Sequence, residues 1–420
     1  MRDLIRPRLL VLNQYYSPGV EATAQLLTDL CEGLAETFEV TVVTGTVEGA
    51  EAGVSERNDV RVVRVRSTRY SRRGLIRRGL NYISYMGLAL ERALRTGRPD
   101  MVFCMTDPPF LGSAGLVVAR RFRVPLVVTT QDVFPEVAVE LGRIRNPFVV
   151  SLIRMLVNTY LHRADRIVAI GETMKDRLEA RGAPPERLRV IPNWIDTKRI
   201  TPQPRDNDWA REHGVDGAFV VMHSGNVGEA QDLDTLIRAA ASLRDLKDMR
   251  LLIIGDGSRY RDLTALAEKL EVENLTFLPY QLRETLSQSL SAATVHFVGL
   301  ARGLTGHVVP SRFYGVLAAG RPAIVAADEE SETVQVVRAV GCGVAIAPGD
   351  PIALAHALRE AHAGKLDLEA MGQRGRAYVV AKADRDVAIS SYRAIFREVL
   401  HDRNPRRRTR APTLPRLPSG

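Results

Sequence analysis

A short glycine loop leading into a helical pattern is the part of this sequence best suited to hold a phosphate. The loop covers residues 303–306 and precedes a helical pattern at 311–319. Such a loop presents backbone N–H groups at a helix N-terminus, where the helix dipole favours an anion. Arg312 falls in the first turn, where a cation is disfavoured unless an anion lies beside it. The pattern predicts phosphate binding by Gly303, Thr305, Gly306, Ser311 and Arg312; a purely structural loop is the alternative.

Two further glycine turns follow predicted strands. Gly255-Asp256-Gly257 follows the apolar run 251–254, and Ser224-Gly225-Asn226 follows 219–223. The amides of Asn226 and Gln231 are suited to a sugar or a phosphate, although either can also cap the helix that follows. The candidate ligand contacts in this region are Gly225, Asn226, Gln231, Gly255, Asp256 and Tyr280.

These loops are positioned by short apolar strands that alternate with helical segments along the chain. Many strands are continuous Val, Ile and Leu runs, as expected of parallel strands covered on both faces. We expect strands at 8–13, 39–44, 60–65, 100–105, 125–130, 165–170, 189–191, 219–223, 250–255, 275–278, 294–298, 322–326 and 344–346. The alternation predicts an α/β protein with two doubly wound sheets.

The alternation of strands and helices begins again after a linker at 197–208 that is rich in Pro, Arg and Asp. We therefore predict an N-terminal Rossmann-like domain at 1–197 and a second one at 198–382. A final helix at 383–402 and a basic, disordered tail at 403–420 follow. Ligands of open α/β sheets bind outside the carboxyl ends of the strands, so we expect a binding cleft where the two sheets face each other.

The composition is that of an ordinary soluble protein. Of its residues, 45% are apolar and 25% are charged. A chain of 420 residues is too long for one compact core, so we expect two domains. Three isolated cysteines offer neither a disulfide framework nor a zinc-binding spacing, as expected in a reducing cytoplasm. No apolar run approaches the roughly 18 residues of a spanning helix. Residues 1–12 predict a first strand and no signal peptide.

Positive charge is concentrated in the N-terminal half. The net charge is +9, and residues 61–98 contain eleven arginines and one acid, Glu91. The chain has no nucleic-acid-binding motif, so phosphates or an anionic membrane surface are the expected partners, and nucleic acid is not. Residues 75–94 predict a helix with a basic start and an aromatic and aliphatic continuation, which suits a membrane interface; core packing is the alternative. The basic tail would add membrane affinity, or remain solvated.

A set of short motifs extends over nearly the whole chain. They are Tyr15-Tyr16-Ser17-Pro18-Gly19, Ile191-Pro192-Asn193-Trp194-Ile195-Asp196, Ser224-Gly225-Asn226, Gly255-Asp256-Gly257, Val309-Pro310-Ser311-Arg312, Ala318-Ala319-Gly320-Arg321-Pro322 and Pro348-Gly349-Asp350. Through this set the chain resembles the retaining GT-B glycosyltransferases of family four. Gln131-Asp132-Val133-Phe134-Pro135-Glu136 and Asp328-Glu329-Glu330-Ser331-Glu332 are similar to the fucosamine transferase branch of O-antigen and colanic-acid assembly.

The resemblance implies a GT-B fold, with two facing Rossmann-like domains and a C-terminal helix that crosses back onto the first. It also implies transfer of a sugar from a nucleotide-sugar donor with retention of configuration, without a cofactor or an obligatory metal. Two acidic triplets, Asp232-Leu233-Asp234 and Asp384-Arg385-Asp386, would suggest a metal. Both fall at predicted helix starts, where acids are favoured, so we interpret both as structural.

One departure from the family concerns two glutamates that usually flank the phosphate loop. Counting back from Gly320, their places are taken by His307 and Gly315. Glycine cannot make the ribose contact usual at the second place. Glu330 or Glu332 would supply a carboxylate from beyond the next strand, or both are surface acids. We include His307 and Glu332 among the expected donor contacts.

The acceptor side is expected in the N-terminal domain. Ser17, Pro18 and Gly19 follow the first strand, and Gln131 and Asp132 follow the strand at 125–130. Asp132 is suited to take the acceptor proton or to stabilise positive charge on the sugar, and is the candidate catalytic residue. It would alternatively cap the following turn, since the leaving phosphate can itself act as the base.

Our leading hypothesis is a glycosyltransferase that adds a sugar, from a UDP-linked donor, to a polyprenyl-diphosphate-linked oligosaccharide in polysaccharide biosynthesis. It would work in the cytoplasm, peripherally on the inner face of the cell membrane. The alternatives are a sugar-nucleotide 2-epimerase of the same fold, which needs carboxylates and histidines in the cleft, and a non-catalytic assembly protein, which the missing glutamates favour.

Overall fold

The computed structural model describes residues 6–19, 21–47, 49–66 and 75–403, with side chains from residue 81 in the last range. The chain forms two compact units. The first comprises the described residues up to Thr129, Thr159–Val168 and those from Ile389 onward; the second comprises Thr130–Asn158 and Ala169–Ala388. Part of the arginine-rich segment 61–98, including Arg72 and Arg73, and the predicted tail beyond Arg403 lie outside the described residues. The domain boundaries at 197 and 382 stay predictions.

The first sheet has the order β3-β4-β2-β1-β5-β6-β7-β8. Its strands are β1 (Arg8–Leu12), β2 (Glu39–Gly45), β3 (Gly53–Arg57), β4 (Val60–Val65), β5 (Met101–Met105), β6 (Leu126–Thr130), β7 (Arg166–Ala169) and β8 (Leu188–Val190). All the strands predicted here from apolar runs are present. The antiparallel edge strand β3 was not predicted, because all five of its residues are exposed and it has no apolar pattern.

The helices between the strands of the first sheet in chain order are α1 (Ala22–Leu34), α2 (Leu75–Arg95), α3 (Leu111–Phe122), α4 (Glu136–Glu140), α5 (Pro147–Leu161) and α6 (Glu172–Ala180), with a 3-10 turn at Pro185–Arg187. The predicted helix at 75–94 is α2, which packs into the core: Tyr85, Ala89 and Ala93 are fully buried, whereas Ile83 is exposed. Among the described residues, no helix combines the length and the apolar character needed to cross a membrane.

The second sheet has the order β11-β10-β9-β12-β13-β14 and lies in the second unit. Its strands are β9 (Phe219–Ser224), β10 (Met249–Ile254), β11 (Leu275–Leu278), β12 (Val295–Gly299), β13 (Ala323–Ala326) and β14 (Gly343–Ile346), all parallel. Every one was predicted to within one residue at each end. The chain proceeds outward from β9 on one side and from β12 on the other, so the strand order reverses between these two central strands.

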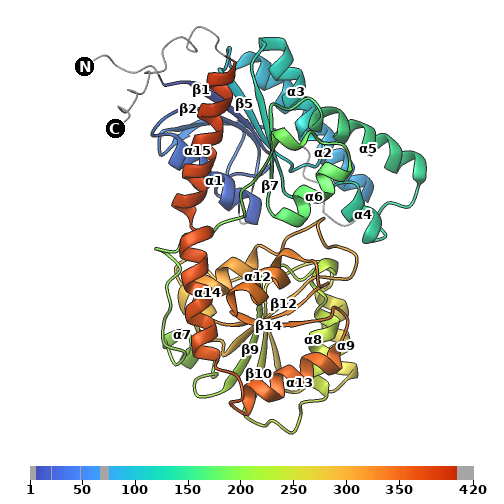
Figure 1. Ribbon diagram of the computed structural model, residues 1–420, viewed down its shortest axis with the longest axis vertical. Coiled ribbons are helices and arrows are strands. Elements are labelled where there is room, and N and C mark those ends of the chain that lie inside the picture. Colours follow the sequence, from blue (N-terminus) through green and yellow to red (C-terminus); the bar gives the residue numbers. More distant parts are fainter. Residues whose placement is uncertain (1–5, 20, 48, 67–74, 404–420) are drawn as a thin grey trace, which may run out of the picture. The chain divides into compact units, whose positions relative to one another are not determined.

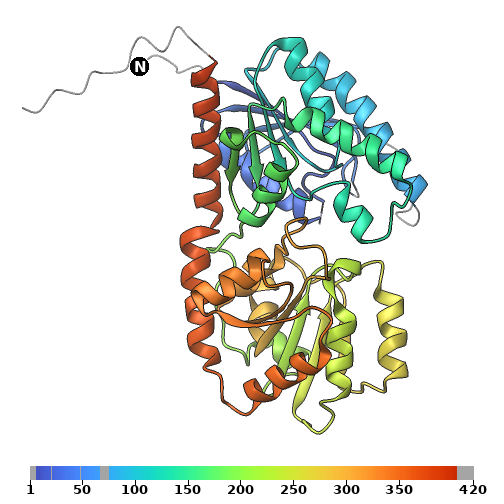
Figure 2. The same cartoon turned by 45° about the vertical axis from the view of Figure 1, so that its right-hand side comes forward.

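Helices cover both faces of this sheet (Figures 1 and 2). The helices are α7 (Asp208–Glu212), α8 (Leu233–Ala241), α9 (Tyr260–Lys269), α10 (Leu286–Ala292), α11 (Arg312–Ala318), α12 (Glu332–Val340), α13 (Pro351–His362) and α14 (Leu368–Lys382), with a 3-10 turn at Glu229–Gln231. Alternate residues of β13 enter different cores: Ile324 packs with α8, α9 and α13, whereas Val325 packs with α11, α12 and α14. The continuous apolar runs of the sequence follow from this two-sided burial.

The predicted C-terminal helix is α15 (Arg385–Asp402), whose residues from Ile389 onward belong to the first unit. Gly33 of α1 gives it room, because a Cβ there would overlap the side chain of Ile389. The hydroxyl of Tyr392 lies 2.9 Å from that of Thr129, and Phe396 packs against Phe103 with ring centroids 5.3 Å apart. Aromatic packing and one buried polar contact therefore fix α15 on the first sheet.

Candidate donor-binding site

The candidate site lies at the carboxyl edge of the second sheet, where the strand order reverses. Gly225 and Asn226 follow β9, Gly255 and Asp256 follow β10, and α11 follows β12 after a long loop. Because the strands are parallel, these loops meet at one edge. Such a switch point is where open α/β sheets bind their ligands. Its chemistry depends on how closely the loops approach each other and on which side chains they carry.

Glycine is required where the first two loops touch. Gly225 and Gly255 have φ of +147° and +135°, which side chains rarely adopt. A Cβ on Gly255 would overlap the carbonyl oxygen of Gly225, and one on Gly257 would overlap that of Val227. The backbones of the two loops are therefore in direct contact, which explains why the sequence has glycine at these predicted positions.

The amides of Asn226 and Gln231 hold the turn after β9. Asn226 Nδ2 donates to Gln231 Oε1 over 3.2 Å, and the N–H of Gly228 donates to the same oxygen over 3.0 Å. Asn226 itself is exposed. Tyr280, which is 53% exposed, donates its hydroxyl to the carbonyl oxygen of Asp256. These predicted contacts thus shape the loops around the site.

Arg312 supplies the positive charge of the site. Its Cδ lies 3.5 Å from the position of a Cβ on Gly225, and its Nη2 donates to the carbonyl oxygen of Gly299 over 2.9 Å. Burial lowers the pKa of Arg312 to about 10, so it remains a cation at neutral pH. Within the described part of the chain, no carboxylate forms an ion pair with it, and its Nε has no hydrogen-bond partner. A half-buried cation of this kind favours an anionic ligand.

The buried His223 lies at the end of β9, near this cation. Its Nε2 donates to the carbonyl oxygen of Asn226 over 3.2 Å, whereas Nδ1 has no hydrogen-bond partner among the residues that the structure describes. Burial, and secondly the charge of Arg312, hold the pKa of His223 well below its usual range. The ring is therefore neutral and fully enclosed, so its visible role is to support the turn.

The glycine loop at 303–306 differs from the phosphate cradle expected there. The hydroxyl of Thr305 donates to Asp328 over 3.0 Å, and the N–H of Gly303 donates to the same carboxylate oxygen over 3.3 Å. Gly303 and Gly306 have φ of +81° and +76°, a backbone conformation that glycine adopts without strain. Asp328 follows the neighbouring strand β13 and reaches this loop, so two of the expected phosphate donors bind a carboxylate of the chain itself. Sequence reasoning missed Asp328 as their partner.

His307 and Asp132 come close together, although they are far apart in sequence. The N–H of Val133 donates to the carbonyl oxygen of His307 over 2.9 Å. His307 is 9% exposed, and its Nδ1 has no hydrogen-bond partner within the described part of the chain. Burial and then Arg177 lower its pKa. Asp132, the residue before Val133, is exposed. The second unit thus places the backbone of His307 against Val133, the residue that follows the predicted catalytic Asp132.

Gln131 is held in place by Asn193, which was not among the site residues predicted from the sequence. Its side-chain amide pairs with that of Asn193, and both residues are buried. The available signal was the Pro192-Asn193-Trp194 motif, which we interpreted as part of the domain junction. Ser17 and Gly19 follow β1 in the first unit, where the N–H of Ser17 donates to Thr28. Pro18 between them is exposed.

Glu332, a predicted donor contact, is engaged with the start of a helix in the structure. Its carboxylate accepts the N–H of Glu172 over 2.9 Å at the start of α6, where the helix dipole favours an anion. Burial raises the pKa of Glu332, and hydrogen bonds from Thr173 and Glu172 oppose that rise. This carboxylate therefore caps a helix in the structure, and its predicted contact with the donor would require it to leave that helix.

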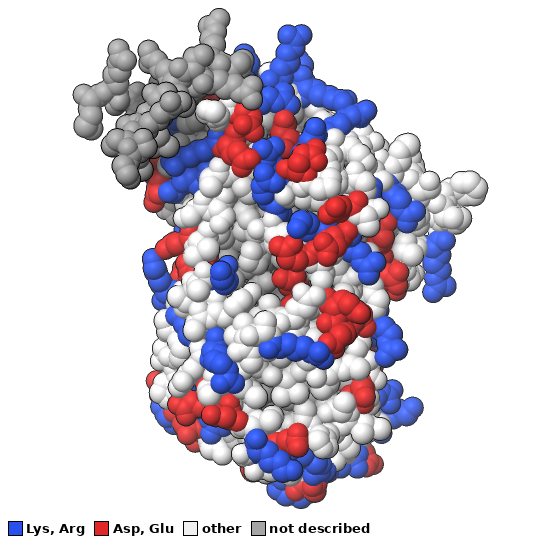
Figure 3. All heavy atoms as spheres, viewed as in Figure 1, with Lys and Arg blue, Asp and Glu red and all other residues white. Residues whose placement is uncertain are grey.

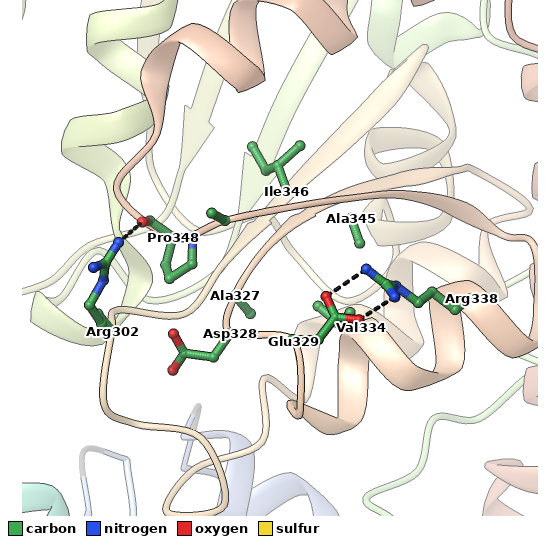
Figure 4. Close-up of a pocket in the computed structure, with 10 residues that line it drawn as sticks. Arg302, Ala327, Asp328, Glu329, Val334, Arg338, Ala345, Ile346 and Pro348 are labelled. Carbon is green, nitrogen blue, oxygen red and sulfur yellow. Dashed lines mark hydrogen bonds and ion pairs between the residues drawn. The ribbon is translucent and has the colours of Figure 1, made fainter.

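A separate pocket of about 290 Å³ lies at the carboxyl ends of β13 and β14 (Figure 4). Its lining includes an ion pair between Glu329 and Arg338, and Arg302, which donates to the carbonyl oxygen of Pro348. Asp328 links the pocket to the loop at 303–306. Neither Gly225 nor Arg312 lines it, so this pocket is distinct from the cationic site at the switch point.

Comparisons with known proteins agree with this geometry. The family of the "Glycosyl transferase 4-like domain" matches residues 21–194, and that of "Glycosyl transferases group 1" matches residues 206–378. The chain belongs to the family-four glycosyltransferases. It is 26% identical over 343 residues to the probable glycosyltransferase WbjE of Pseudomonas aeruginosa, covering 80% of this chain and 84% of that protein.

A second relative of this glycosyltransferase is the putative colanic acid biosynthesis glycosyl transferase WcaI of Escherichia coli K12. It is 26% identical and covers 64% of this chain and 68% of its own length. Among solved structures, sucrose-phosphate synthase of Thermosynechococcus elongatus covers 94% of this chain and 100% of its own, with a TM-score of 0.77 and 18% identity. The structure of HepE of Anabaena in complex with UDP covers 93% of this chain and 100% of its own, with a TM-score of 0.71 and 15% identity. The fold is therefore GT-B.

Proposed function

We propose that this glycosyltransferase transfers a sugar from a UDP-linked donor to a polyprenyl-diphosphate-linked oligosaccharide, with retention of configuration, in polysaccharide biosynthesis. The observation that carries the proposal is the half-buried Arg312, which has no described carboxylate partner and lies against Gly225 at the switch point. A diphosphate leaving group provides the anion that this cation lacks. UDP is favoured because the similarly folded HepE was solved with UDP.

The proposed reaction breaks the bond between the sugar C1 and the diphosphate oxygen and forms one from C1 to an acceptor hydroxyl. Arg312 stabilises the charge that develops on the departing UDP. The acceptor proton passes to the leaving phosphate, and Asp132 stabilises positive charge on the sugar. The neutral His307 would offer Nδ1, which has no hydrogen-bond partner among the described residues, to a sugar hydroxyl.

No obligatory metal is part of the proposal. Both carboxylates of the first acidic triplet are already engaged: Asp232 accepts from Gly349 N–H and Thr235, and Asp234 pairs with Arg259. In the second triplet, Asp384 accepts from Thr197 and from the N–H of Asp386. We expect EDTA to leave sugar transfer unchanged. Loss of transfer in EDTA that only added Mg²⁺ or Mn²⁺ restores would contradict the proposal.

The proposed acceptor rests on the positive charge of the N-terminal half and on the name of one relative. WcaI is named for colanic acid biosynthesis, and the arginine-rich segment at 61–98 suits a lipid diphosphate at the inner face of the cytoplasmic membrane. The test incubates the purified chain with a panel of UDP- and GDP-sugars and short-chain polyprenyl-diphosphate glycans, with mass spectrometry for transfer and NMR for the anomer. Absence of transfer and of donor hydrolysis across the panel would overturn the proposal.

The 2-epimerase alternative is separated by the same incubation without an acceptor. An epimerase would convert the donor sugar into its 2-epimer, whereas the proposed transferase leaves the sugar configuration of the donor unchanged. The buried and neutral His223, engaged with Asn226, does not favour the epimerase. Calorimetry with UDP and GDP tests the third alternative, since a non-catalytic assembly protein would bind neither.

A further inference from the structure

The helix α5 presents apolar side chains to solvent along one side. Phe148 is 84% exposed, Leu152 54% and Leu156 39%, and Val149 between them is 43% exposed. Their spacing of three to four residues places them on neighbouring turns of one helical face. Met155, also exposed, extends the same face. We define the apolar face of α5 by these five residues, all within the second unit.

This face is not a consequence of a poorly formed helix. Asn146 caps its start, with its side-chain oxygen accepting the N–H groups of Phe148 and Val149, and Pro147 occupies the first turn, where it is well tolerated. On the other side of α5, Val157 is buried and Arg154 pairs with Glu136 over 3.0 Å. The helix therefore packs by one face and exposes the apolar side chains of the other to solvent.

The charge around α5 favours one kind of partner. The segment 141–164 contains four arginines and no acidic residue. Arg145 is exposed just before the helix, and within the described residues it forms no ion pair. In Figure 3 the part of the surface over the end of α5 at the right is mostly uncharged. Two of these arginines, Arg143 and Arg154, pair with Glu229 and Glu136. Exposed apolar side chains beside the unpaired Arg145 suit the boundary between the headgroups and acyl chains of an anionic bilayer.

We propose that the apolar face of α5 inserts into the surface of an anionic membrane, with Arg145 contacting lipid phosphates. This rests on the proposed function in so far as it specifies where the enzyme meets the membrane that carries its acceptor. It adds a contact surface to the predicted interfacial helix α2, whose buried residues are part of the core.

The test is flotation of the full-length protein with vesicles of phosphatidylcholine alone or mixed with phosphatidylglycerol. Binding to the anionic vesicles is expected, and Phe148→Ser and Leu152→Ser should each weaken it about tenfold, as expected for one bilayer-inserted large apolar side chain. The matched control is Ile352→Ser on α13, where the side chain is 82% exposed. Arg145→Gln should weaken binding only to the anionic vesicles, compared with Arg283→Gln, another exposed arginine.

Folding and catalysis are measured separately for each variant. Circular dichroism and UDP binding should be unchanged, because the substituted side chains are exposed and lie outside the donor site. Transfer to a water-soluble acceptor analogue should also be unchanged, so failure of the proposed function would appear there and not in flotation. Equal vesicle binding by wild type and both α5 variants would overturn the inference. A dimer that dissociates on Leu152→Ser, in a protein that does not bind vesicles, would instead assign the face to a second copy of the chain.

Discussion

The hydroxyl of Thr305 donates a 3.0 Å hydrogen bond to the carboxylate of Asp328. Because the acceptor is charged, replacing the hydroxyl should remove about 1.5–3 kcal/mol of stability. We therefore expect Thr305→Val to lower the free energy of unfolding in urea while changing UDP affinity by less than about twofold. Thr276→Val, at an exposed position of β11, is the control for stability. A large loss of UDP affinity with unchanged stability would assign the hydroxyl to the donor phosphate instead.

Arg312→Met should separate donor binding from stability. Removal of a charge-assisted contact with the diphosphate should weaken UDP binding by roughly 30-fold or more, measured by calorimetry. Stability should change little, because loss of the hydrogen bond to the Gly299 carbonyl is offset by removal of a half-buried charge that no described carboxylate pairs with. Arg338→Met, which breaks only the surface pair with Glu329, should leave UDP affinity unchanged. Unchanged UDP affinity in Arg312→Met would remove the main support for the donor site.

Gly255→Ala should be far more destabilising than conformational strain alone explains. A φ in this range costs a non-glycine residue about 1–3 kcal/mol, and Gly53→Ala, with φ of +151° and open space around it, measures that cost by itself. In Gly255→Ala the new methyl would also overlap the Gly225 carbonyl, adding roughly 1–3 kcal/mol. Urea unfolding of both variants tests this, and equal losses of stability would show that the two loops separate easily.

The fold was predictable because its strands are apolar runs with clear ends. Parallel strands covered on both faces need no polar alternation, so runs such as 219–223 and 323–326 are recognisable without knowledge of their neighbours. The strand β3 shows the limit of this reasoning. Its residues are exposed, and it exists because Val54 and its neighbours pair with β4, a contact that the local sequence does not encode.

The candidate site was less predictable, because its contacts join distant segments. Glycines 225 and 255 were identified from local turn patterns, but their mutual contact comes from the order of β9 and β10. Thr305 and Glu332 were assigned to the donor by motif position, whereas in the structure they contact Asp328 and the start of α6. Those roles as ligand contacts stay predictions. A side chain's partner is set by the packing of strands far apart in sequence.

The buried His296 should make the protein lose stability as the pH falls through the weakly acidic range. Its Nε2 donates to the carbonyl oxygen of Leu290, and its Nδ1 has no partner in the described ranges of the chain. Burial lowers the pKa of His296 to about 4 from an ordinary 6.5. Between these values the unfolded chain binds a proton that the folded protein excludes. The stabilising contribution of the neutral ring is thus complete above pH 6.5 and is lost as the pH falls towards 4.

The corresponding change is about 3 kcal/mol by proton linkage. His296→Gln keeps a side-chain N–H for Leu290 but cannot titrate, so its stability should fall less steeply than that of wild type between pH 6.5 and 4. Urea unfolding across this range measures both slopes. His356→Gln, at an exposed position of α13, is the matched control and should follow wild type. Parallel curves for wild type and His296→Gln would mean that the acid sensitivity comes from the other buried rings, His223 and His307, whose pKa values burial also lowers.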